Sequence, residues 1–382
     1  MKDGKIEVAM VGLGAAGGTL TEQAVASGLT ESVLVLNSSY EDLESLKLIP
    51  TENKVKLSEV GGAAKDRVKI YEQFRKNGNP QKFMDAFDAR IMNSPREIVF
   101  VAASGAGGTG SGLVVIIARM IRQKYPNLKV IPLIIMPGMN ERGIAQQNAL
   151  DCTRELESAG FCMIRVDNNR IENNSIFEKY TEINKETIEN LRRFINFDKI
   201  SKFQNIDVAD RLAMFGDSGM LMIGSSLVDP DEPSPMKAAV KRALETTPMT
   251  ADIAGNIKRV AIQCEMDSVL YTEENRDDTS AIFKNAAGIF EGFYEPEELN
   301  GNITNRVLVV ISGAHIAASE IRERESLVEQ QFQEDKTKDI KIGEGNKAVK
   351  NAWTTASAGS TSEAAPADDY SNLFDEVDAL RK

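Results

Sequence analysis

A glycine-rich segment, residues 104–112, follows a short apolar run and constrains the fold of this chain more than any other feature. It reads Ser-Gly-Ala-Gly-Gly-Thr-Gly-Ser-Gly, and the run before it, Ile98 to Ala103, has the length and composition of a buried strand. Glycines let backbone N–H groups close around a phosphate, and a helix predicted from Leu113 to Lys124 would point its positive dipole end at the same place. The pattern therefore predicts a strand–loop–helix unit that binds phosphate.

Strand-like and helix-like segments alternate through the first half of the chain. Such alternation predicts an α/β fold with a doubly wound, mostly parallel sheet, and with ligand-binding loops at the carboxyl ends of the strands. The strand-like segments are residues 6–11, 33–36, 98–103, 130–135 and 161–166, and the helix-like segments are residues 19–27, 64–76, 112–124 and 146–159.

A long helical pattern over about residues 176–197 follows, and its length indicates a central helix between two domains. Further on, helix-like stretches alternate with strand-like ones, which predicts a smaller α/β domain. We expect a ligand-binding domain at residues 1–175, the central helix at 176–204, the smaller domain at 205–335, and a tail at 336–382 that is polar and flexible up to residue 367.

Apolar residues recur at roughly helical spacing near the end of this tail, among acidic residues. Two interpretations stay open. The end is either irregular and solvated, or it is a short motif that folds on a partner. The apolar residues are Tyr370, Leu373, Phe374, Val377 and Leu380.

Charge and composition exclude several classes of protein. Acidic residues outnumber basic ones by 57 to 45, so the folded body is not expected to bind nucleic acid directly. No apolar stretch reaches membrane-spanning length, so membrane insertion is not expected. Three cysteines without C-x-x-C spacing suit the reducing cytoplasm. With a single histidine, His315, any chemistry must depend on carboxylates and backbone amides.

A second glycine-rich loop, residues 12–18, formally matches the dinucleotide-binding pattern G-x-G-x-x-G. That pattern requires an acidic residue at the end of the second strand to bind the ribose of NAD. Here the second strand ends in Leu-Asn-Ser-Ser, residues 36–39, without a carboxylate. Two phosphate-binding loops at one sheet edge suit a nucleoside triphosphate better, and an NAD-dependent enzyme is only a distant alternative.

The sequence of residues 106–112, Ala-Gly-Gly-Thr-Gly-Ser-Gly, resembles the signature loop of the tubulin and FtsZ family. The resemblance covers roughly residues 5–315 and implies a GTP-binding domain, with GTP or GDP as the nucleotide and Mg²⁺ as its cofactor. It also implies that subunits associate head to tail with one another into a filament.

The resemblance assigns residues to the phosphates of the nucleotide. They fall in a first phosphate loop, at the start of a second, in a loop that senses the γ-phosphate, and in the main phosphate loop. In that order they are Gly14, Ala15, Ala16 and Gly17; Asn37; Gly62 and Ala63; and Gly105, Ala106, Gly107, Gly108, Thr109, Gly110 and Ser111.

Further positions match the family's contacts to the ribose and the base. Pro137 and Glu141 fall where ribose contacts are expected. Asn168 follows a predicted strand, and its amide can both donate to and accept from a guanine edge. Tyr180 and Asn184, on the predicted central helix, fall near the second set of guanine contacts.

Residues 205–210 read Asn-Ile-Asp-Val-Ala-Asp and look like the FtsZ loop that activates a neighbouring subunit. The resemblance implies that Asn205, Asp207 and Asp210 enter the next subunit's site and orient the attacking water and the metal. Hydrolysis of GTP would then be stimulated by assembly. Without the family, Asp207 and Asp210 would be interpreted as helix N-cap residues.

Details of several loops resemble the TubZ-type tubulins of plasmids and phages more than FtsZ. Gly18-Thr19 stands where FtsZ carries a longer glycine run, and Asp167-Asn168-Asn169 replaces its Pro-Asn-Asp. The resemblance implies a GTP-dependent filament that segregates or positions plasmid or phage DNA, with a DNA-binding adaptor attached through the C-terminal tail. The alternative is an FtsZ-type ring protein of cell division.

Overall fold

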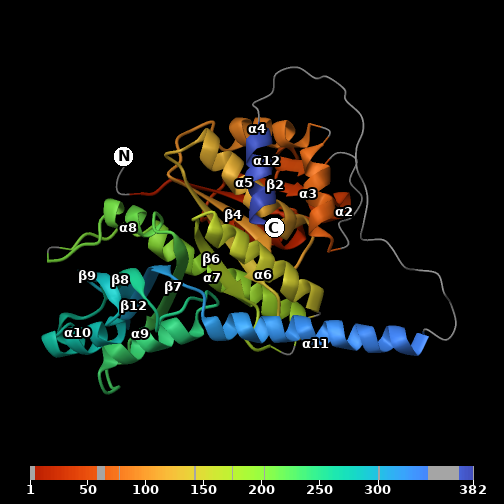
Figure 1. Cartoon of the computed structure of the whole chain (residues 1–382). Helices are drawn as coiled ribbons and strands as arrows, with labels where there is room; N and C mark the ends of the chain where they lie inside the picture. Colours follow the sequence, from red (N-terminus) through yellow and green to blue (C-terminus); the bar gives the residue numbers. More distant parts are fainter. Residues whose placement is uncertain are drawn as a thin grey trace.

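The computed structural model describes residues 5–57, 65–76, 78–141, 143–173, 175–201, 203–299, 302–342 and 370–381. One large sheet crosses this part of the chain, with helices packed over it (Figure 1).

The N-terminal half supplies the first six strands and six helices of the described chain. The strands are β1 (Val8–Leu13), β2 (Val33–Asn37), β3 (Lys54–Lys56), β4 (Ile98–Ser104), β5 (Lys129–Met136) and β6 (Cys162–Asp167). The helices are α1 (Gly14–Ala26), α2 (Tyr40–Ser45), α3 (Arg67–Arg75), α4 (Asn79–Arg90), α5 (Thr109–Lys124) and α6 (Gly143–Ser158).

These strands are parallel neighbours in the order β3-β2-β1-β4-β5-β6. Every residue of β1 is buried, as expected for a central strand of a parallel sheet that is covered on both faces. β1 and β4 pair directly, and Leu13 lies opposite Ala103. Since both strands end at the same edge, the glycine-rich loops that follow them are neighbours in space.

The C-terminal half adds one long central helix and a second group of strands and helices. Its helices are α7 (Ile176–Ile195), α8 (Val208–Met214), α9 (Pro235–Thr246), α10 (Glu273–Ser280), α11 (Ala318–Ile342) and α12 (Ser371–Leu380). Its strands are β7 (Gly219–Leu227), β8 (Ile257–Glu265), β9 (Ala286–Tyr294), β10 (Glu297–Leu299), β11 (Asn302–Thr304) and β12 (Arg306–Ala314).

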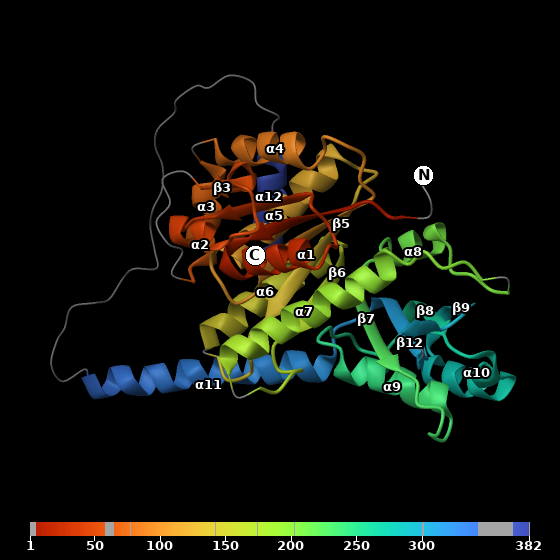
Figure 2. The same ribbon diagram turned by 180° about the vertical axis from the view of Figure 1, so that it is seen from behind.

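The two halves share the sheet through a short parallel pairing of β6 with β7, in which Cys162 lies opposite Gly219 and Met163 opposite Met220. Beyond β7 the order continues β12-β8-β9, and β12 runs antiparallel to both of its neighbours. α7 crosses the molecule between the two halves, with α8 beyond its C-terminal end (Figure 2). Arg211 of α8 is buried and donates to the carbonyls of Phe194 and Ile195, which fixes α8 to the end of α7.

The predicted fold class, an α/β protein with a parallel sheet and a smaller C-terminal α/β part, is confirmed by this architecture. The alternation of segments predicted the type of each main element in the N-terminal half. It missed the helices α2, α4 and α10. It also missed the strands β3, β9, β10 and β11, because short or partly exposed strands carry little apolar periodicity.

The boundary expected between the smaller domain at 205–335 and the tail at 336–382 falls inside α11, because this helix continues to Ile342. Residues 336–342 are mostly charged or polar, and this composition alone predicts a tail rather than the last turns of a helix. The helix packs on α6, where Arg154 pairs with Glu325 and a Cβ on Gly143 would lie 2.7 Å from Cβ of Gln331. Residues 343–369 of the predicted tail lie outside the described residues.

Replacing Gly224 by alanine tests the contact of β7 with α9. A Cβ at this position would overlap the carbonyl oxygen of Ala243. We expect Gly224→Ala to lower the free energy of unfolding by about 1–3 kcal/mol, as overpacking does, measured as a lower denaturation midpoint. Gly288→Ala in β9 is the matched control, because its Cβ would meet no atom closer than 3.9 Å. Equal midpoints for both variants would contradict this packing.

Candidate nucleotide-binding site

Two adjoining hollows lie at the carboxyl ends of the parallel strands. The first has a volume of about 310 Å³ and the second about 270 Å³, and both are lined by Ala16 and Ser104. Together they form one cleft at the sheet edge where ligands of doubly wound folds bind. Most of the predicted nucleotide-binding residues line this cleft.

The first hollow is built by the loops after β1, β2 and β4. Gly14 opens α1 with a positive φ of 71°, a conformation that glycine adopts without strain. The N-terminus of α5 begins at Thr109 and directs its dipole toward the hollow. The predicted residues that line this hollow are Gly14, Ala15, Ala16, Asn37, Gly107, Gly108, Thr109 and Gly110.

Two of these loops are held together by their glycines. A Cβ on Gly17 would overlap the carbonyl oxygen of Ala102, so only glycine lets α1 approach β4 this closely. A Cβ on Gly110 would lie 3.0 Å from both the nitrogen and the oxygen of Ser104. A Cβ on Gly107 would meet no atom closer than 3.9 Å, so there is open space beside this residue of the loop.

The loop after β2 adds polar groups that the sequence interpretation missed. Nδ2 of Asn37 donates to Oδ2 of Asp42 at 3.0 Å, and the hydroxyls of Ser38 and Thr109 lie 3.0 Å apart. Ser39 caps α2 by accepting from the backbone N–H of Asp42. Hydroxyl and acidic residues directly after a strand at this sheet edge were the available signal for Ser38, Ser39 and Asp42.

The second hollow combines loops after β4, β5 and β6 with the N-terminal half of α7. Glu141 accepts from the backbone N–H of Gly138 at 3.0 Å. Burial, and then the carboxylate of Glu141, raise the pKa of Tyr180, so its phenol stays protonated at neutral pH and can donate a hydrogen bond. The predicted residues that line this hollow are Ala16, Ala106, Pro137, Glu141, Asn168, Tyr180 and Asn184.

Several predicted residues lie next to the cleft without lining either hollow. Gly17 packs against β4, and Gly105 packs against Ala149 of α6, with its built Cβ at 3.1 Å. The buried hydroxyl of Ser111 donates to the carbonyl of Gly107 and stabilises the loop from within. Gly62 and Ala63, predicted to sense a γ-phosphate, lie outside the described residues.

The predicted catalytic residues lie beyond the C-terminal end of α7, whereas Tyr180 and Asn184 lie in its N-terminal half (Figure 2). Asp207 and Asp210 form a capping box at the start of α8, each accepting from the other's backbone N–H at 2.8 and 3.1 Å. Asn205 is exposed and bonds to the backbone of Ser201. Within one chain these three residues line neither hollow.

Arg324 of α11 is a further residue that the sequence interpretation missed. It is fully buried and donates to the carbonyl of Pro137 at 3.0 Å and to Oε1 of Gln146 at 2.6 Å. Its Nε donates to Glu320, which also accepts from Arg165. Burial alone would raise the pKa of Glu320, but the guanidiniums of Arg165 and Arg324 hold it below its usual value. α11 thus fixes the loop that carries Pro137.

In the described part of the chain, we find no group of three or more acidic, histidine or cysteine side chains placed to hold a metal ion. Among the described helices, none combines the length and the apolar content that crossing a membrane requires.

Comparison with known proteins shows which protein family the N-terminal half of the chain resembles. Residues 7–175 match the model of the Tubulin/FtsZ family, GTPase domain. The chain is 24% identical over 303 residues to the tubulin-like protein CetZ of Pyrococcus horikoshii, which covers 76% of this chain and 81% of that protein. It is 26% identical over 231 residues to the tubulin-like protein TubZ of Clostridium botulinum C phage, covering 56% and 61%. With the CetZ of Methanothrix thermoacetophila the match spans only 57% of the relative's length, at 26% identity over 55% of this chain.

Solved structures share the fold over most of the chain. A GTPγS-form protofilament of Bacillus thuringiensis serovar israelensis TubZ superposes with a TM-score of 0.74 at 15% identity, covering 89% of this chain and 94% of that one. The GTPγS-bound protofilament of CetZ2 from Haloferax volcanii gives 0.70 at 18% identity, covering 87% and 100%.

The parallel sheet and the two-part cleft define a nucleotide-binding α/β protein. More specifically, residues 7–175 match the GTPase domain of the Tubulin/FtsZ family, and the proteins to which the chain is similar include TubZ and CetZ proteins.

Replacing Arg324 by methionine tests whether α11 supports the cleft. The variant leaves the carbonyl of Pro137 and the amide oxygen of Gln146 without their donor and Glu320 with one partner fewer. Breaking a buried ion pair typically costs about 3–5 kcal/mol, so we expect a clearly lower denaturation midpoint and weaker nucleotide binding. Arg322→Met, at an exposed position of the same helix, is the control. A midpoint equal to that of the control would show that Arg324 does not stabilise this region.

Proposed function

We propose that this protein is a GTPase whose subunits polymerise head to tail and hydrolyse GTP at each junction. One observation carries the proposal. The predicted nucleotide-binding residues gather in one cleft, whereas Asn205, Asp207 and Asp210 lie at the surface beyond the far end of α7. α7 has 20 residues, so about 30 Å of helix runs between these regions. Only a second subunit can bring the two sets together.

The cleft suits GTP in one orientation. The phosphates belong in the first hollow, against the N-terminus of α5 and beside Gly107. The base belongs in the second hollow, where Asn168, Tyr180 and Asn184 offer amide and phenol groups, and the ribose lies between, near Pro137 and Glu141.

Mg²⁺ would be held mainly by the phosphates and water, as it commonly is in nucleotide sites. The residues of the first hollow fit this ion, because Asp42 and Thr109 place hard oxygen atoms beside the phosphate loops. The ion would neutralise charge on the β- and γ-phosphate oxygens.

The carboxylates of residues 207 and 210 are suited to activate a neighbour's nucleotide. The capping box uses Oδ1 of Asp207 and Oδ2 of Asp210 and so fixes both side chains at the start of α8. Each carboxylate has a second oxygen that can orient water at the junction. Positioning and electrostatics carry most of the catalysis in phosphoryl transfer, so no histidine is required.

The division of the chain follows from this mechanism. We assign nucleotide binding to residues 1–175, the central helix to 176–204, activation of the next subunit to 205–342, so that the whole of α11 is included, and partner binding to the tail that follows α11. The filaments would form in the cytoplasm.

A cytomotive filament that moves plasmid or phage DNA is the cellular role that we propose. The likeness to the TubZ of a phage supports it. The net charge of −12 disfavours direct contact with DNA, so the filament would need a DNA-binding adaptor attached to its tail. A division-ring function is the second candidate, supported by 24% identity over 326 residues to the cell division protein FtsZ of Haloferax mediterranei. Loss of a plasmid or phage replicon on gene deletion, without a division defect, would favour the first.

Replacing Asp210 by asparagine tests the catalytic assignment without removing the helix cap. Asparagine keeps an oxygen that accepts from the N–H of Asp207 but carries no charge. We expect GTP binding to stay normal, turnover to fall by about 100-fold or more, and filaments to persist. Thr272→Ala, which removes the N-cap of α10 instead, should leave turnover unchanged. Normal turnover in Asp210→Asn would refute the assignment.

The shared site itself is tested by following GTP hydrolysis and light scattering together while the protein concentration is varied. We expect turnover per subunit to rise above a threshold concentration, and scattering to decay as GTP is consumed. Turnover that is independent of concentration and produces no scattering would mean a self-contained GTPase, and the filament proposal would fail.

A further inference from the structure

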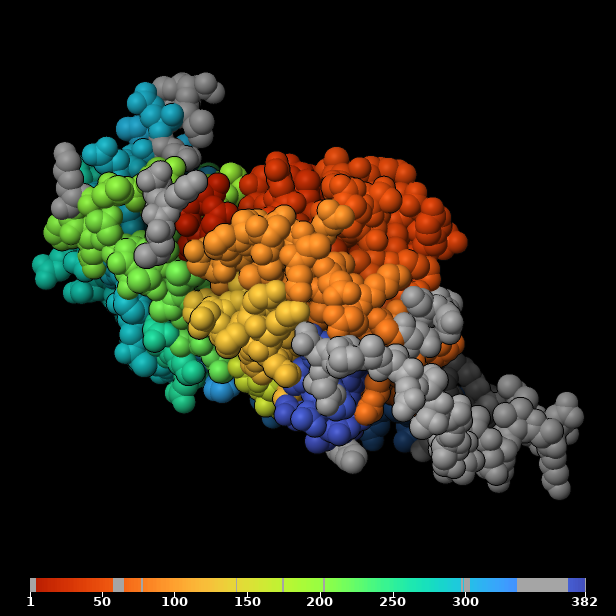
Figure 3. Space-filling view, turned by 90° about the horizontal axis from the view of Figure 1, so that it is seen from above, coloured from red at the N-terminus to blue at the C-terminus, as the bar shows by residue number. Residues whose placement is uncertain are grey.

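The last described helix, α12, lies against the chain's own nucleotide-binding half, on a surface formed by α3, α5 and α6. Figure 3 shows it in blue between the orange and yellow surfaces of that half. We name this surface, made by Tyr71, Phe74, Arg75, Arg119 and Glu155, the α12 site.

Apolar contacts form the centre of the α12 site. Val377 is fully buried, and the ring of Phe374 lies 5.4 Å from that of Tyr71 and 6.4 Å from that of Phe74, centroid to centroid. The hydroxyl of Tyr71 also donates to the carbonyl of Phe374 at 2.9 Å. Leu373 is buried as well. Leu373, Phe374 and Val377 belong to the apolar residues that recur at helical spacing in the sequence. The buried face of α12 therefore accounts for this apolar periodicity.

Charged pairs around this centre are complementary. Arg75 lies 3.3 Å from both Asp375 and Asp378, and Arg119 pairs with Glu376. Exposed ion pairs contribute little affinity singly, but three acidic residues facing two arginines fix the orientation and register of the helix. The site therefore recognises an acidic, amphipathic helix.

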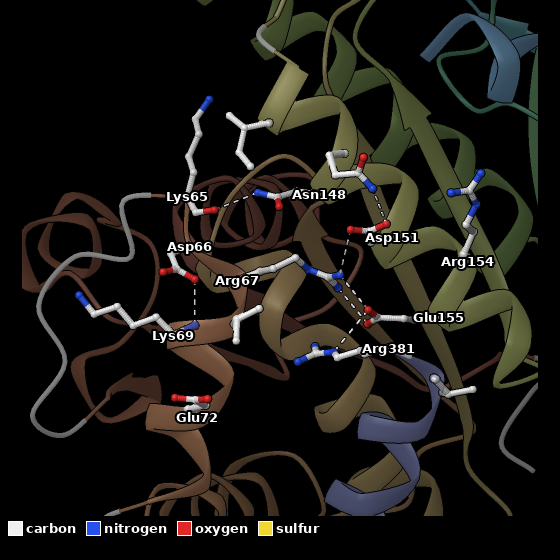
Figure 4. A pocket seen from close by; sticks show the side chains of 14 residues that line it. Lys65, Asp66, Arg67, Lys69, Glu72, Asn148, Asp151, Arg154, Glu155 and Arg381 are labelled. Carbon is white, nitrogen blue, oxygen red and sulfur yellow. Dashed lines mark hydrogen bonds and ion pairs between the residues drawn. The ribbon is translucent and has the colours of Figure 1, made fainter. Parts of the chain in front are cut away.

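The C-terminal end of α12 reaches the turn that follows the phosphate loop. Arg381 stacks over the ring of Tyr71 at 4.0 Å and donates to the carbonyl of Gly112 at 3.1 Å. Its Nε lies 3.3 Å from Glu155. Glu155 accepts two hydrogen bonds from Arg67, of 2.8 and 2.9 Å (Figure 4). Arg67 also donates to the carbonyl of Ser111. Arg67 and Arg381 thus both contact the carboxylate of Glu155, and each donates to one backbone carbonyl in the first turn of α5.

The connection to α11 makes the chain's own α12 the natural occupant. Residues 343–369, rich in Ala, Ser, Thr and Gly, separate the two helices. A connection of this kind gives an effective concentration on the order of millimolar, far above that of a second copy at micromolar protein. In the unassembled chain, docking within one molecule is therefore favoured.

We propose that the α12 site is a docking site for this chain's own acidic C-terminal helix, and that Arg381 couples its occupancy to the phosphate loop. Docked Arg381 stabilises the first turn of α5, whose N-terminal amides face the phosphates. Docking and nucleotide binding then strengthen each other by the same factor, because such coupling is reciprocal. The coupling step rests on the proposed nucleotide site, whereas the docking step does not.

Hydrogen exchange of the full-length chain at low micromolar concentration tests docking. We expect amides of α12 to exchange at least about tenfold more slowly in the wild type than in Val377→Asp, and α3 to lose protection in the same variant. Asn372→Ala, at an exposed position of α12, should behave as the wild type. Exchange of α12 at the unprotected rate in the wild type would overturn the proposal, as would protection that appears only when the protein is concentrated.

Nucleotide affinity of the same proteins tests coupling, with GDP titrated into the full-length chain. We expect Arg381→Ala to keep the protection of α12 but to bind GDP about fivefold more weakly, and Val377→Asp to show the same loss. If the wild type does not bind GDP, the proposed nucleotide site fails while the exchange result still judges docking. If the wild type binds GDP and Arg381→Ala binds it equally well, the coupling is refuted.

Discussion

The close approach of α1 to β4 is the contact on which the rest of the site depends. Gly17 packs on the carbonyl of Ala102, and Gly110 packs on the backbone of Ser104, so the loops after two paired strands share one small volume. Any side chain there would separate them. With the loops in contact, the amides at the start of α5 and the backbone of α1 face one hollow. The glycines therefore set the spacing of the two phosphate-binding loops, and only some of them face the ligand.

In the proposed mechanism one chain carries two incomplete halves of a site, and the same architecture explains this division. Doubly wound sheets present ligand loops at one edge, and α7 carries the chain from that edge toward the opposite side of the molecule. Arg211 then locks α8 onto the end of α7, so the acidic loop at residues 205–210 is held rigidly and outward. α8 at one end of the molecule and an open cleft at the other suit a head-to-tail contact between subunits. When such contacts do not close into a ring, they build a filament.

Local sequence patterns predicted the fold class and the two glycine-rich loops of the cleft, whereas the other cleft residues were assigned through the resemblance to the tubulin and FtsZ family. A strand followed by a glycine-rich loop and a helix places residues 104–112 at the sheet edge, whatever the rest of the chain does. Ser38 and Asp42 could not be predicted as cleft residues without knowing the turn that leads into α2. Arg324 could not be predicted without its contact to Gln146, which lies 178 positions away in the chain. Such long-range pairs leave no periodic signal. The spacing of the apolar residues at the end of the tail indicated a helix, but spacing alone could not show which surface this helix covers.

Two C-terminal helices act on the nucleotide-binding half in the same chemical way. Arg324 of α11 donates to the carbonyl of Pro137, which lines the second hollow, and Arg381, just after α12, donates to the carbonyl of Gly112 in the first turn of α5. Each arginine also contacts a buried or partly buried carboxylate, Glu320 or Glu155, which fixes its position. Because a guanidinium can bind a carboxylate and a carbonyl at once, each helix end is tied to a loop rather than merely packed beside it. The loops of the cleft are thereby connected to both C-terminal helices, in each case through a single arginine side chain.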